Sequence, residues 1–546
     1  HEPRRHRAPI DPRRYRTELA AIIREVLAAQ AARGGERTGA PLPAERLDAI
    51  LRRHPRDGRG FFSRSDLIEG YRVLAAEEGL PADEATFVRA VRRKRVRTLS
   101  GVAPVTVFTR PFPCPGRCVY CPNDVRMPKS YLAAEPGAQR AADNGFDPYL
   151  QTWNRLAAFR ALGHATDKVE LIVLGGTWSA YPDAYRRWFV KRLFDALDDF
   201  GAGRDGRASV RANGGDAAAP AARLRGRDVD SRAYNRAVGG WLRREHAGRL
   251  EPEHERASWS ELEAAQRRNE TSAARCVGLV FETRPDCVTA AEVEHLRRLG
   301  ATKVQLGVQS LDDGVLSANA RGHDVACTRR AFALLRAAGF KIHAHWMPNL
   351  LGATPASDVC DFARLFDDAD FRPDELKVYP CSLVESDELV PHHQRGGRRR
   401  HAHEEMRDIV VAALEGAPRW CRLTRVIRDI ASDGIVVGNR LANFREIAER
   451  ELAKRGGRPR DIRARELRGR AVATDALRLV ETRYATSTGE ECFLELVGQD
   501  DALAGFLRLH LPSRIAGADG AAASPAELAG AAVVRELHVY GEVAPL

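Results

Sequence analysis

Three cysteines, Cys114, Cys118 and Cys121, lie within the stretch "PFPCPGRCVYC" at residues 111–121. Its prolines and glycine allow the backbone to wrap, so that three sulfur atoms can converge. Three thiolates can bind three irons of a cubane iron–sulfur cluster and leave the fourth iron for a ligand that is not protein. A structural zinc site needs a fourth protein ligand, and the nearest downstream histidine, His164, has no paired spacing. The spacing therefore favours a 4Fe-4S cluster with an open iron over zinc or redox-active thiols.

The other seven of the ten cysteines show no ligand spacing, and we interpret them as small core residues. So few cysteines in 546 residues do not form a disulfide scaffold, which indicates a reducing, cytoplasmic location. No stretch approaches the roughly 20 apolar residues of a membrane-spanning helix, so no membrane contact is expected. The sequence starts with "HEPRRHRAPIDPRRYR", which has no apolar segment, and we expect no secretory signal.

The chain has an excess of positive charge, with a formal net charge of +12 at pH 7. Any single basic run is compatible with a solvated loop. Several runs around one reactive centre favour a polyanionic partner. The run that precedes the cysteines, "VRRKRVR" at 91–97, is the main candidate for phosphate binding, and its basic residues are Arg92, Arg93, Lys94, Arg95 and Arg97.

The spacing of apolar residues divides the chain into a helical start, an α/β middle and an antiparallel end. Residues 1–99 contain amphipathic helical stretches, which predict a small helical domain. Over residues 100–430, apolar β-branched runs alternate with amphipathic helices, which predicts a parallel sheet as an open sheet or a full or partial barrel. The expected strands are 102–108, 168–175, 276–282, 303–309, 341–347, 375–380 and, as a further candidate, 422–428.

Three further segments depart from this alternation. Residues 201–260, rich in Gly, Ala and Arg, are typical of a flexible insertion. Residues 431–470 are expected to be a linker. From 471 to 546, the stretches "ALRLVETRYATSTGEECFLELVGQ", "LAGFLRLHLPS" and "AAVVRELHVYG" predict antiparallel strands of a separate α+β domain.

The cysteine motif and a second motif resemble the radical S-adenosylmethionine (SAM) superfamily. C-x3-C-x2-C follows the first strand and has an aromatic residue, Tyr120, before its last cysteine, and "LGGT" at 174–177 matches the superfamily's glycine-rich motif. The resemblance implies that the open iron binds SAM, whose reductive cleavage gives a 5′-deoxyadenosyl radical. It also implies that Gly175, Gly176 and Thr177 lie near SAM, because bare backbone leaves room for its amino group.

A finer resemblance extends over roughly residues 90–546. The motifs that carry it occur in the order "PCPGRCVYCPNDVRMPKSY", "FDPYLQTWNRL", "DKVELIVLGGTW", "CVGLVFETRPD", "VQLGVQS", "RGH", "KIHAHWMPNLLG", "DELKVYPC" and "VRELHVYGEV". In this order they resemble the catalytic subunit of Elongator and its stand-alone bacterial and archaeal relatives. The resemblance implies a radical SAM partial (β/α)6 barrel, preceded by a small helical domain and followed by an incomplete α+β domain of the GNAT acetyltransferase type.

This resemblance also implies an activity. The family forms a 5-carboxymethyl-type wobble uridine in tRNA, with acetyl-CoA as the carbon source. An adenosyl radical would take hydrogen from the acetyl methyl, the carbon radical would add to the uracil, and the thioester would be hydrolysed. The uridine must first leave the anticodon stack, and basic arms would hold tRNA phosphates without reading sequence. A reductant for the cluster is a further implied partner, and a homodimer is left open.

Polar residues at the ends of the expected strands are the candidates for catalysis. Glu282 and Arg284 in "ETRPD" follow the third strand, where a strand-end salt bridge is the alternative. Gln309 in "VQLGVQS" lies on one face of the next strand, where a polar layer of a barrel interior is the alternative. The residues that we leave open between a site and a structural role are Asp286, Gln305, His345 and Asn349.

Two places are implied by the resemblance to contact acetyl-CoA. Lys168 precedes the second strand and would otherwise be interpreted as a solvated lysine. In "VRELHVYG" the backbone of Glu536, Leu537, His538 and Val539 would pair with the pantetheine arm; without the family this is only an alternating strand. The family's glycine-rich turn and helix for the CoA pyrophosphate do not follow, so we expect an incomplete site and weak or absent acetyl-CoA turnover.

Many bacterial relatives have a small cysteine cluster where this chain has "GGRPRDIRARELRG" at 456–469, and we therefore expect no zinc there. Two other functions stay open: a protein lysine acetyltransferase with a structural cluster, and a non-catalytic RNA-binding scaffold. The missing CoA loop and the arginines near the cluster argue against the first. Anaerobic SAM cleavage, lysine acetylation unaffected by Cys118→Ala, and RNA binding without cluster absorbance would distinguish the three.

Overall fold

The computed structural model of the chain divides into two compact units, residues 1–103 with 154–168 and residues 104–153 with 169–546. The first unit takes in the expected helical domain and adds the end of a later helix. The structure describes residues 10–33, 42–81, 83–92, 100–213, 230–384, 388–394, 401–428, 430, 435–438, 441, 443–467, 472–513, 525–528 and 530–540.

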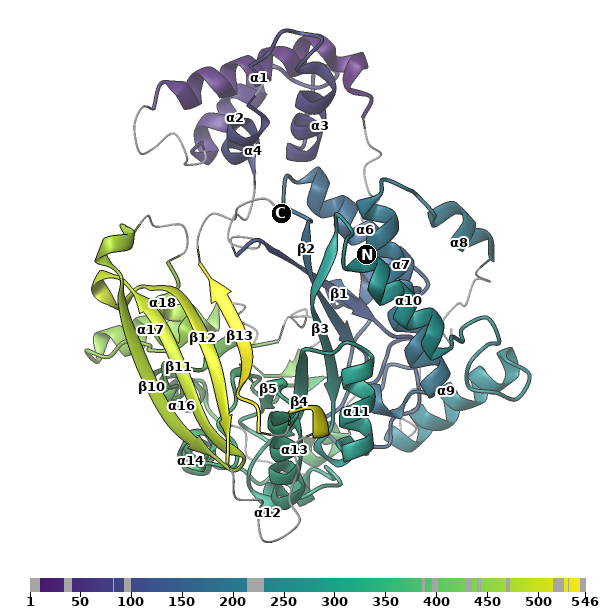
Figure 1. Ribbon diagram of the computed structural model, residues 1–546, viewed down its shortest axis with the longest axis vertical. Helices are drawn as coiled ribbons and strands as arrows, with labels where there is room; N and C mark the ends of the chain where they lie inside the picture. The colour runs from purple at the N-terminus through teal and green to yellow at the C-terminus, as the bar shows by residue number, and fades with distance from the viewer. Residues whose placement is uncertain are drawn as a thin grey trace. The chain divides into compact units, whose positions relative to one another are not determined.

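The first unit consists of helices that bury their apolar faces against one another (Figure 1). Leu19, Ile23 and Phe87 are fully buried in this core, as the amphipathic spacing predicts. Ser63 and Asp66 cap the start of α3 reciprocally, each side chain bonding the other's backbone N–H. The elements are η1 (Pro12–Tyr15), α1 (Arg16–Ala31), α2 (Ala44–Arg53), α3 (Arg64–Leu74), α4 (Glu84–Val91) and the second half of α6 (Pro148–Ala161).

The second unit is organised around a seven-stranded sheet that curls into a half-barrel (Figure 1). The neighbouring strands from β3 to β8 pair in parallel. Leu279, Phe281, Val304 and Leu306 are fully buried, so these strands have apolar positions on the side that the helices cover. The strands, in sheet order, are β1 (Val102–Phe108), β2 (Lys168–Leu174), β3 (Arg275–Thr283), β4 (Lys303–Gln309), β5 (Lys341–Trp346), β6 (Glu375–Val378) and β8 (Arg422–Val426). The predicted α/β class is confirmed.

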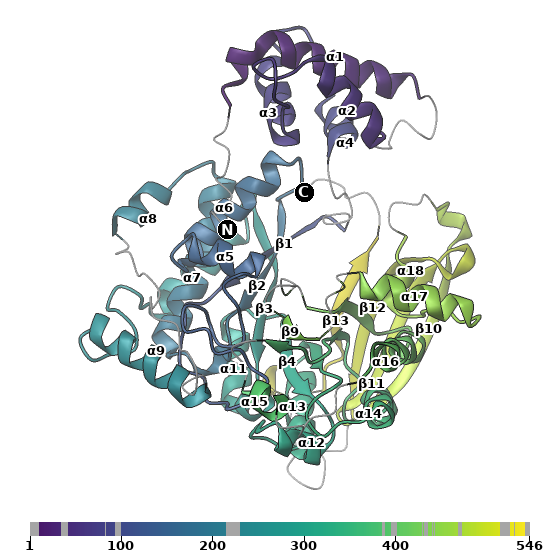
Figure 2. The ribbon, with the colours of Figure 1, turned by 180° about the vertical axis from the view of Figure 1, so that it is seen from behind.

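Helices pack around the outside of this sheet (Figure 2). Side chains of Thr289, Asp312, Asp324 and Thr354 cap four of them, which explains where these helices begin. Among the described residues, none of the helices has the length and apolar character needed to cross a bilayer. The helices are α5 (Pro136–Ala142), α7 (Asp183–Gly201), α10 (Trp259–Asn269), α11 (Ala290–Arg298), α12 (Asp313–Ala318), α13 (Val325–Ala337), α14 (Pro355–Asp367) and α16 (His403–Gly416).

The expectation of a flexible insertion at 201–260 is wrong for its described second half. The side chain of Asp230 caps α9, and Tyr234 and Leu242 are fully buried. Residues 214–229 lie outside the described residues. The helices of this segment are α8 (Arg207–Asn213) and α9 (Ser231–Glu245). The expectation rested on the overall Gly, Ala and Arg content of the segment, whereas the packing of α9 depends on a few apolar positions.

The expected linker at 431–470 contains two helices and a strand. The ring of Phe444 on α17 packs edge-on against His403 of α16, with centroids 5.5 Å apart. The linker is therefore partly built onto the half-barrel. The elements around it are α15 (Leu389–Gln394), α17 (Phe444–Lys454), α18 (Ile462–Arg465) and a small antiparallel sheet of β7 (Leu383–Val384) with β9 (Ile435–Val437).

The last elements of the second unit form the expected antiparallel sheet (Figure 1). One face buries Tyr484, Phe493 and Phe506, whereas on β13, the edge strand, Leu537 and Val539 are 68% and 66% exposed. The strands, in order, are β10 (Arg478–Thr486), β11 (Gly489–Val497), β12 (Leu503–Pro512) and β13 (Val533–Val539).

Candidate functional site

The three cysteines occupy a loop that follows β1. Cys118 is buried, whereas Cys114 and Cys121 are half-buried. Asn235 of α9 holds the loop by two hydrogen bonds: its Oδ1 accepts from the Cys114 amide at 2.9 Å, and its Nδ2 donates to the Cys114 carbonyl at 2.8 Å. A helix 121 residues further along the chain therefore fixes the position of the first cysteine.

Two guanidinium groups face the sulfur of Cys118. Nη1 of Arg321 donates to Cys118 Sγ at 3.3 Å, and Nη1 of Arg284 does so at 3.5 Å; both arginines are buried. The hydrogen bond with Cys121, and then the charges of Arg321 and Arg284, lower the pKa of Cys118 well below its ordinary value. A Cβ on Gly116 would lie 1.9 Å from Nη1 of Arg284, so the loop needs glycine where it crosses this side chain.

The other two sulfurs have hydroxyl neighbours. Cys114 Sγ lies 3.4 Å from Oγ1 of Thr177, and Cys121 Sγ lies 3.1 Å from Oγ of Ser130. Each sulfur of the loop thus has a hydrogen-bonding side chain, as anionic metal ligands require. Among the described residues, no three His, Cys, Asp or Glu side chains are placed to hold a single metal ion; cysteines of a cubane bind one iron each. The donor set fits a cluster.

The glycine-rich motif lies beside this loop. Gly175 and Gly176 follow β2 with φ of 141° and 83°. A Cβ on Gly175 would lie 1.8 Å from Oγ1 of Thr109, and Tyr181 Oη donates to the Gly175 carbonyl at 2.8 Å. Both positions therefore need glycine, and the adjacent Thr177 reaches the first cysteine. The structure brings the predicted SAM residues and the cysteines together, whereas their contact with SAM stays a prediction.

Glu282 and Gln309, two candidates for catalysis, have different surroundings. Glu282 Oε2 accepts from Tyr131 Oη at 2.8 Å, and its Oε1 lies 3.4 Å from Nδ1 of His345. Gln309 has a φ of 72°, and its buried Oε1 has no hydrogen-bond partner among the described residues. Buried amide oxygens are rarely left without a partner, so Gln309 is suited to a ligand.

The remaining candidates have structural partners. Arg284 forms the expected strand-end salt bridge, with both Nε and Nη2 2.8 Å from the carboxylate of Asp286. Its third nitrogen, Nη1, faces Cys118 at 3.5 Å, and a role of Arg284 in catalysis stays a prediction. Asn349 donates to the carbonyl of Cys381 at 3.1 Å, which joins two loops.

A cation in the barrel interior was missed from the sequence. Lys377 of β6 donates to Oε1 of Gln305, and burial lowers the pKa of Lys377 to about 8. His345 Nε2 lies 3.0 Å from the same oxygen, and burial, then the charge of Lys377, lowers the pKa of His345 well below its ordinary value. The signal was present: in "KVY", Lys377 and Tyr379 share one face of a strand.

Lys168 and β13 lie away from the cysteine loop and the glycine-rich motif. Lys168 is the first residue of β2 and Gly175 follows its last, so about 20 Å of strand separates them. Glu536 of β13 pairs with Lys341, the first residue of β5, and with Arg508 at 2.9 Å. The edge strand therefore lies at the end of the half-barrel where the strands begin. Contact of Lys168, Glu536, Leu537, His538 and Val539 with acetyl-CoA stays a prediction.

Only one basic residue of the expected phosphate-binding run lies within the described residues. Arg92 follows α4, is half-buried and donates to the carbonyl of Gly163 at 3.3 Å. Burial, followed by the charge of Arg89, lowers the pKa of Arg92. The other members lie outside the described residues, and they are Arg93, Lys94, Arg95 and Arg97.

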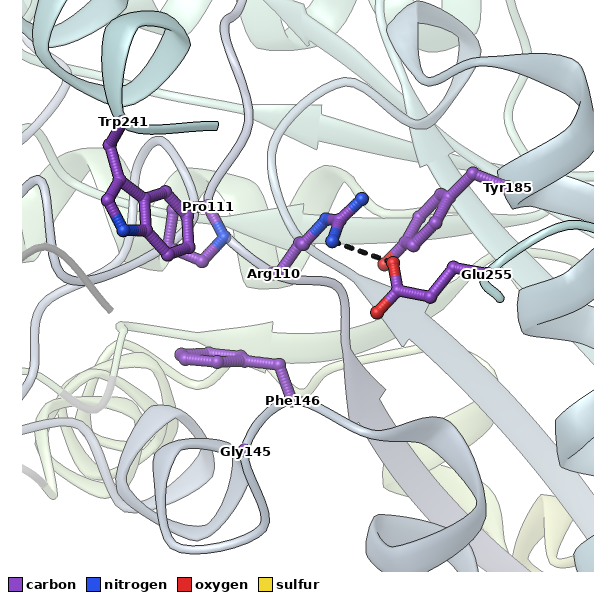
Figure 3. Close-up of a pocket in the computed structure, with 7 residues that line it drawn as sticks. All are labelled: Arg110, Pro111, Gly145, Phe146, Tyr185, Trp241 and Glu255. Atoms are coloured by element: carbon purple, nitrogen blue, oxygen red, sulfur yellow. Dashed lines mark ion pairs between the residues drawn. The ribbon is translucent and has the colours of Figure 1, made fainter. Parts of the chain in front are cut away.

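A small pocket lies beside the cysteine loop, and the side chains that line it contact one another (Figure 3). Its volume is about 10 Å³, which is room for about one water molecule. Arg110 forms an ion pair with Glu255 at 2.7 Å and lies 4.8 Å above the ring of Tyr185. Burial raises the pKa of Glu255 to about 7. The pocket is a packing feature at the base of the loop and is too small for a cofactor.

Comparison with known proteins identifies the family. The chain is 33% identical to the tRNA uridine(34) acetyltransferase of Methanocaldococcus jannaschii over 526 residues, which cover 93% of this chain and 84% of that protein. It is 31% identical to the human Elongator complex protein 3, over 85% of this chain and 77% of that protein. This chain belongs to that family. Residues 373–454 also match the Radical_SAM C-terminal domain model.

The fold agrees with a solved member of this family. The archaeal Methanocaldococcus infernus Elp3 with an N-terminal deletion superposes with a TM-score of 0.59 and 32% identity, over 81% of this chain and 83% of that one. The predicted radical SAM half-barrel, with an antiparallel sheet after it, is confirmed. The family implies a 4Fe-4S cluster and SAM. The match to the Radical_SAM C-terminal domain model, from 373 to 454, extends into the expected linker at 431–470.

Proposed function

We propose that this chain is a tRNA-modifying radical SAM enzyme that uses acetyl-CoA to form a 5-carboxymethyl-type uridine at the wobble position. One observation supports the proposal most: in a member of this family, three cysteines, each with a hydrogen-bonding neighbour, lie in one loop after the first strand of the half-barrel. The family relatives named tRNA uridine(34) acetyltransferase support the substrate and the position.

The roles of individual residues follow from their places. Cys114, Cys118 and Cys121 would hold the 4Fe-4S cluster, and the backbone of Gly175 and Gly176, which directly follows β2, would contact SAM beside it. When bound, the cluster and SAM would supply the carbon-centred oxidant that removes hydrogen from an acetyl methyl group. The chain itself positions these groups and excludes water from them.

Deeper in the half-barrel, the chain provides acid–base groups. Tyr131 donates to Glu282 at 2.8 Å, and the pKa of about 8 of Lys377 lets it hold or release a proton near neutral pH. These side chains would orient the uracil or the thioester and exchange protons with them. Acetyl-CoA as co-substrate, tRNA phosphates on the run at 91–97, a reductant, a homodimer and a cytoplasmic location belong to the same proposal, and the absence of zinc at 456–469 stays a prediction.

The first test compares two cysteine variants after anaerobic reconstitution with iron and sulfide. The wild-type protein and Cys360→Ala, which changes an exposed cysteine of α14, should bind iron and cleave SAM to 5′-deoxyadenosine. Cys118→Ala should lose SAM cleavage at least about a hundredfold, because one corner of the cluster loses its ligand. Nucleoside analysis of tRNA incubated with acetyl-CoA should find the modified base at the wobble position.

Three outcomes would contradict the proposal. A wild-type protein that stays colourless and lacks iron and sulfide has no cluster. SAM cleavage by Cys118→Ala at the wild-type rate would show that the loop is not the site. Acetylation of protein lysines that is unaffected by Cys118→Ala would favour the acetyltransferase alternative.

A further inference from the structure

Arg321 is a buried cation that no carboxylate of the described residues pairs with directly. Its Nη1 donates to Cys118 Sγ at 3.3 Å and its Nη2 donates to the carbonyl of Gly307. Its Nε is buried without a hydrogen-bond partner, and it forms no ion pair with an acidic side chain in the part of the chain that the structure describes. Only 4% of the residue is exposed. A buried guanidinium is costly unless an anion faces it, and the anion here is sulfur.

The neighbouring Arg284 is locked against Arg321. Its Nη2 donates to the Arg321 carbonyl at 2.7 Å, while Asp286 takes its other side. Among the described residues, Asp286 bonds only Arg284, and both guanidiniums point an Nη1 at the Cys118 sulfur. The remaining positive charge is directed at one ligand of the cluster.

The backbone makes room for this pair of arginines. A Cβ on Gly307 would lie 2.8 Å from Nη2 of Arg321, and one on Gly116 would lie 1.9 Å from Nη1 of Arg284. Gly322, with a φ of 82°, directly follows Arg321 and adopts a backbone conformation that favours glycine. The backbone at Gly116 and Gly307 therefore leaves space for the two guanidinium groups, and this packing fixes their orientation toward the Cys118 sulfur.

We propose that Arg321, together with Arg284, positions the Cys118 sulfur and raises the reduction potential of the 4Fe-4S cluster bound there. A reduced cluster carries one more negative charge than an oxidised one, so a nearby cation stabilises the reduced form more. N–H···S hydrogen bonds act in the same direction. The inference rests on the proposed function only in requiring that the chain binds the cluster.

A second chemistry could use the same cation, since the carboxylate of SAM is also an anion. The distance of 3.3 Å to the Cys118 sulfur favours the cluster ligand as the partner. The two roles differ in one measurable way. A cation at the sulfur changes the cluster's potential without SAM, whereas a cation for the SAM carboxylate changes only SAM binding.

The test is a redox titration of reconstituted protein without SAM, followed by electron paramagnetic resonance. At a fixed applied potential, Arg321→Gln should lower the ratio of reduced to oxidised cluster at least tenfold, which for one electron corresponds to about 59 mV. Arg321→Lys keeps the charge and should show a smaller decrease. Arg330→Gln, at an exposed position of the following helix, should match the wild type.

The outcomes separate the inference from the proposed function. A wild type without iron refutes the proposed function, whereas the inference is judged by comparing variants with a loaded wild type. Arg321→Gln with full iron and an unchanged potential overturns the inference, and weakened SAM binding in that variant would assign Arg321 to SAM. If Arg321→Gln folds by circular dichroism but loses iron, Arg284→Gln replaces it in the titration, and an unchanged potential there also overturns the inference.

Discussion

The two ends of the half-barrel both bury cations, but they balance them differently. Where the strands begin, Lys303 lies 2.8 Å from Glu170 and 3.2 Å from Glu375, and all three come from different strands. Where the cysteine loop lies, Arg321 faces the sulfur of Cys118 and no carboxylate among the described residues. At the first end, the protein's own carboxylates balance the buried positive charge. At the second end, a bound cluster would supply the balancing negative charge.

The balanced end also joins the seven-stranded sheet to the four-stranded antiparallel sheet. Asp374, just before β6, accepts from both Nη1 and Nη2 of Arg535 on β13 at 2.7 Å. Arg508 of β12 lies 3.5 Å from the same carboxylate, and Glu491 of β11 lies 2.9 Å from Arg535. These side chains are almost fully buried. Paired buried charges add little net stability but are strict about geometry, so they fix how the antiparallel sheet docks.

The two kinds of charge balance distinguish structural from functional cations in one fold. A guanidinium that meets a carboxylate on each side is satisfied without a ligand, as Arg535 is with Asp374 and Glu491. A guanidinium aimed at a thiol is satisfied only if that sulfur is anionic, as it is on a metal. The charge balance of each buried cation therefore indicates which end does chemistry.

The largest expected effect is at the balanced end. Asp374→Ala should lower the free energy of unfolding by about 3–5 kcal/mol, because it leaves two buried guanidiniums short of a carboxylate. Urea denaturation would measure this loss. Asp408→Ala is the matched control, since its pair with Arg455 is solvent-exposed and should contribute about 0.2–1 kcal/mol. Equal losses in the two variants would show that the buried network does not hold the sheet.

The next effect depends on pH and compares two lysines of the interior. Burial lowers the pKa of Lys377 from 10.5 to about 8, so between these values the unfolded chain binds more protons than the folded one. Stability relative to Lys377→Met should therefore rise with pH over the range 8 to 10, by on the order of 2 kcal/mol.

Lys303 is the control for this pH dependence. The charges of Glu170 and Glu375 outweigh its burial and raise its pKa, so its contribution should be complete below pH 10 and constant from 8 to 10. Urea denaturation of wild type, Lys377→Met and Lys303→Met at pH 7, 8, 9 and 10 would measure both. If the difference in free energy of unfolding between wild type and Lys377→Met stays constant from pH 8 to 10, the charge of Lys377 is balanced in the interior, as that of Lys303 is.

The local parts of this architecture could be predicted from the sequence, and the long-range parts could not. The C-x3-C-x2-C spacing and Gly175-Gly176 are short motifs, and the alternation of strands and helices predicted a parallel sheet, whereas the partial barrel was implied by the family resemblance. Arg321 meets Cys118 across 203 residues of sequence, and no spacing rule connects them. Lys303, Lys341 and Glu375 each begin a strand, and charges at the starts of otherwise apolar strands were a signal of the buried network.

The smallest effect on stability, but the most selective, is expected from one methyl group in the cysteine loop. Gly116→Ala places a Cβ within 1.9 Å of Nη1 of Arg284, and this guanidinium can move only by giving up its bonds to Asp286 and Arg321. We expect a loss of about 1 kcal/mol in the free energy of unfolding and a lower cluster potential, since the contact with Cys118 is lost.

A second glycine provides the control for this methyl group. Gly240 lies inside α9, and a Cβ there would have its nearest neighbour at 3.5 Å, so Gly240→Ala should stabilise the helix by about 0.5–1 kcal/mol. Urea denaturation of both variants would measure the steric effect of the added methyl group, and redox titration would measure the effect of moving the Arg284 charge away from Cys118. If Gly116→Ala keeps the wild-type potential while losing stability, the loop needs glycine for packing alone, and the inferred role of Arg284 in setting the cluster potential is overturned.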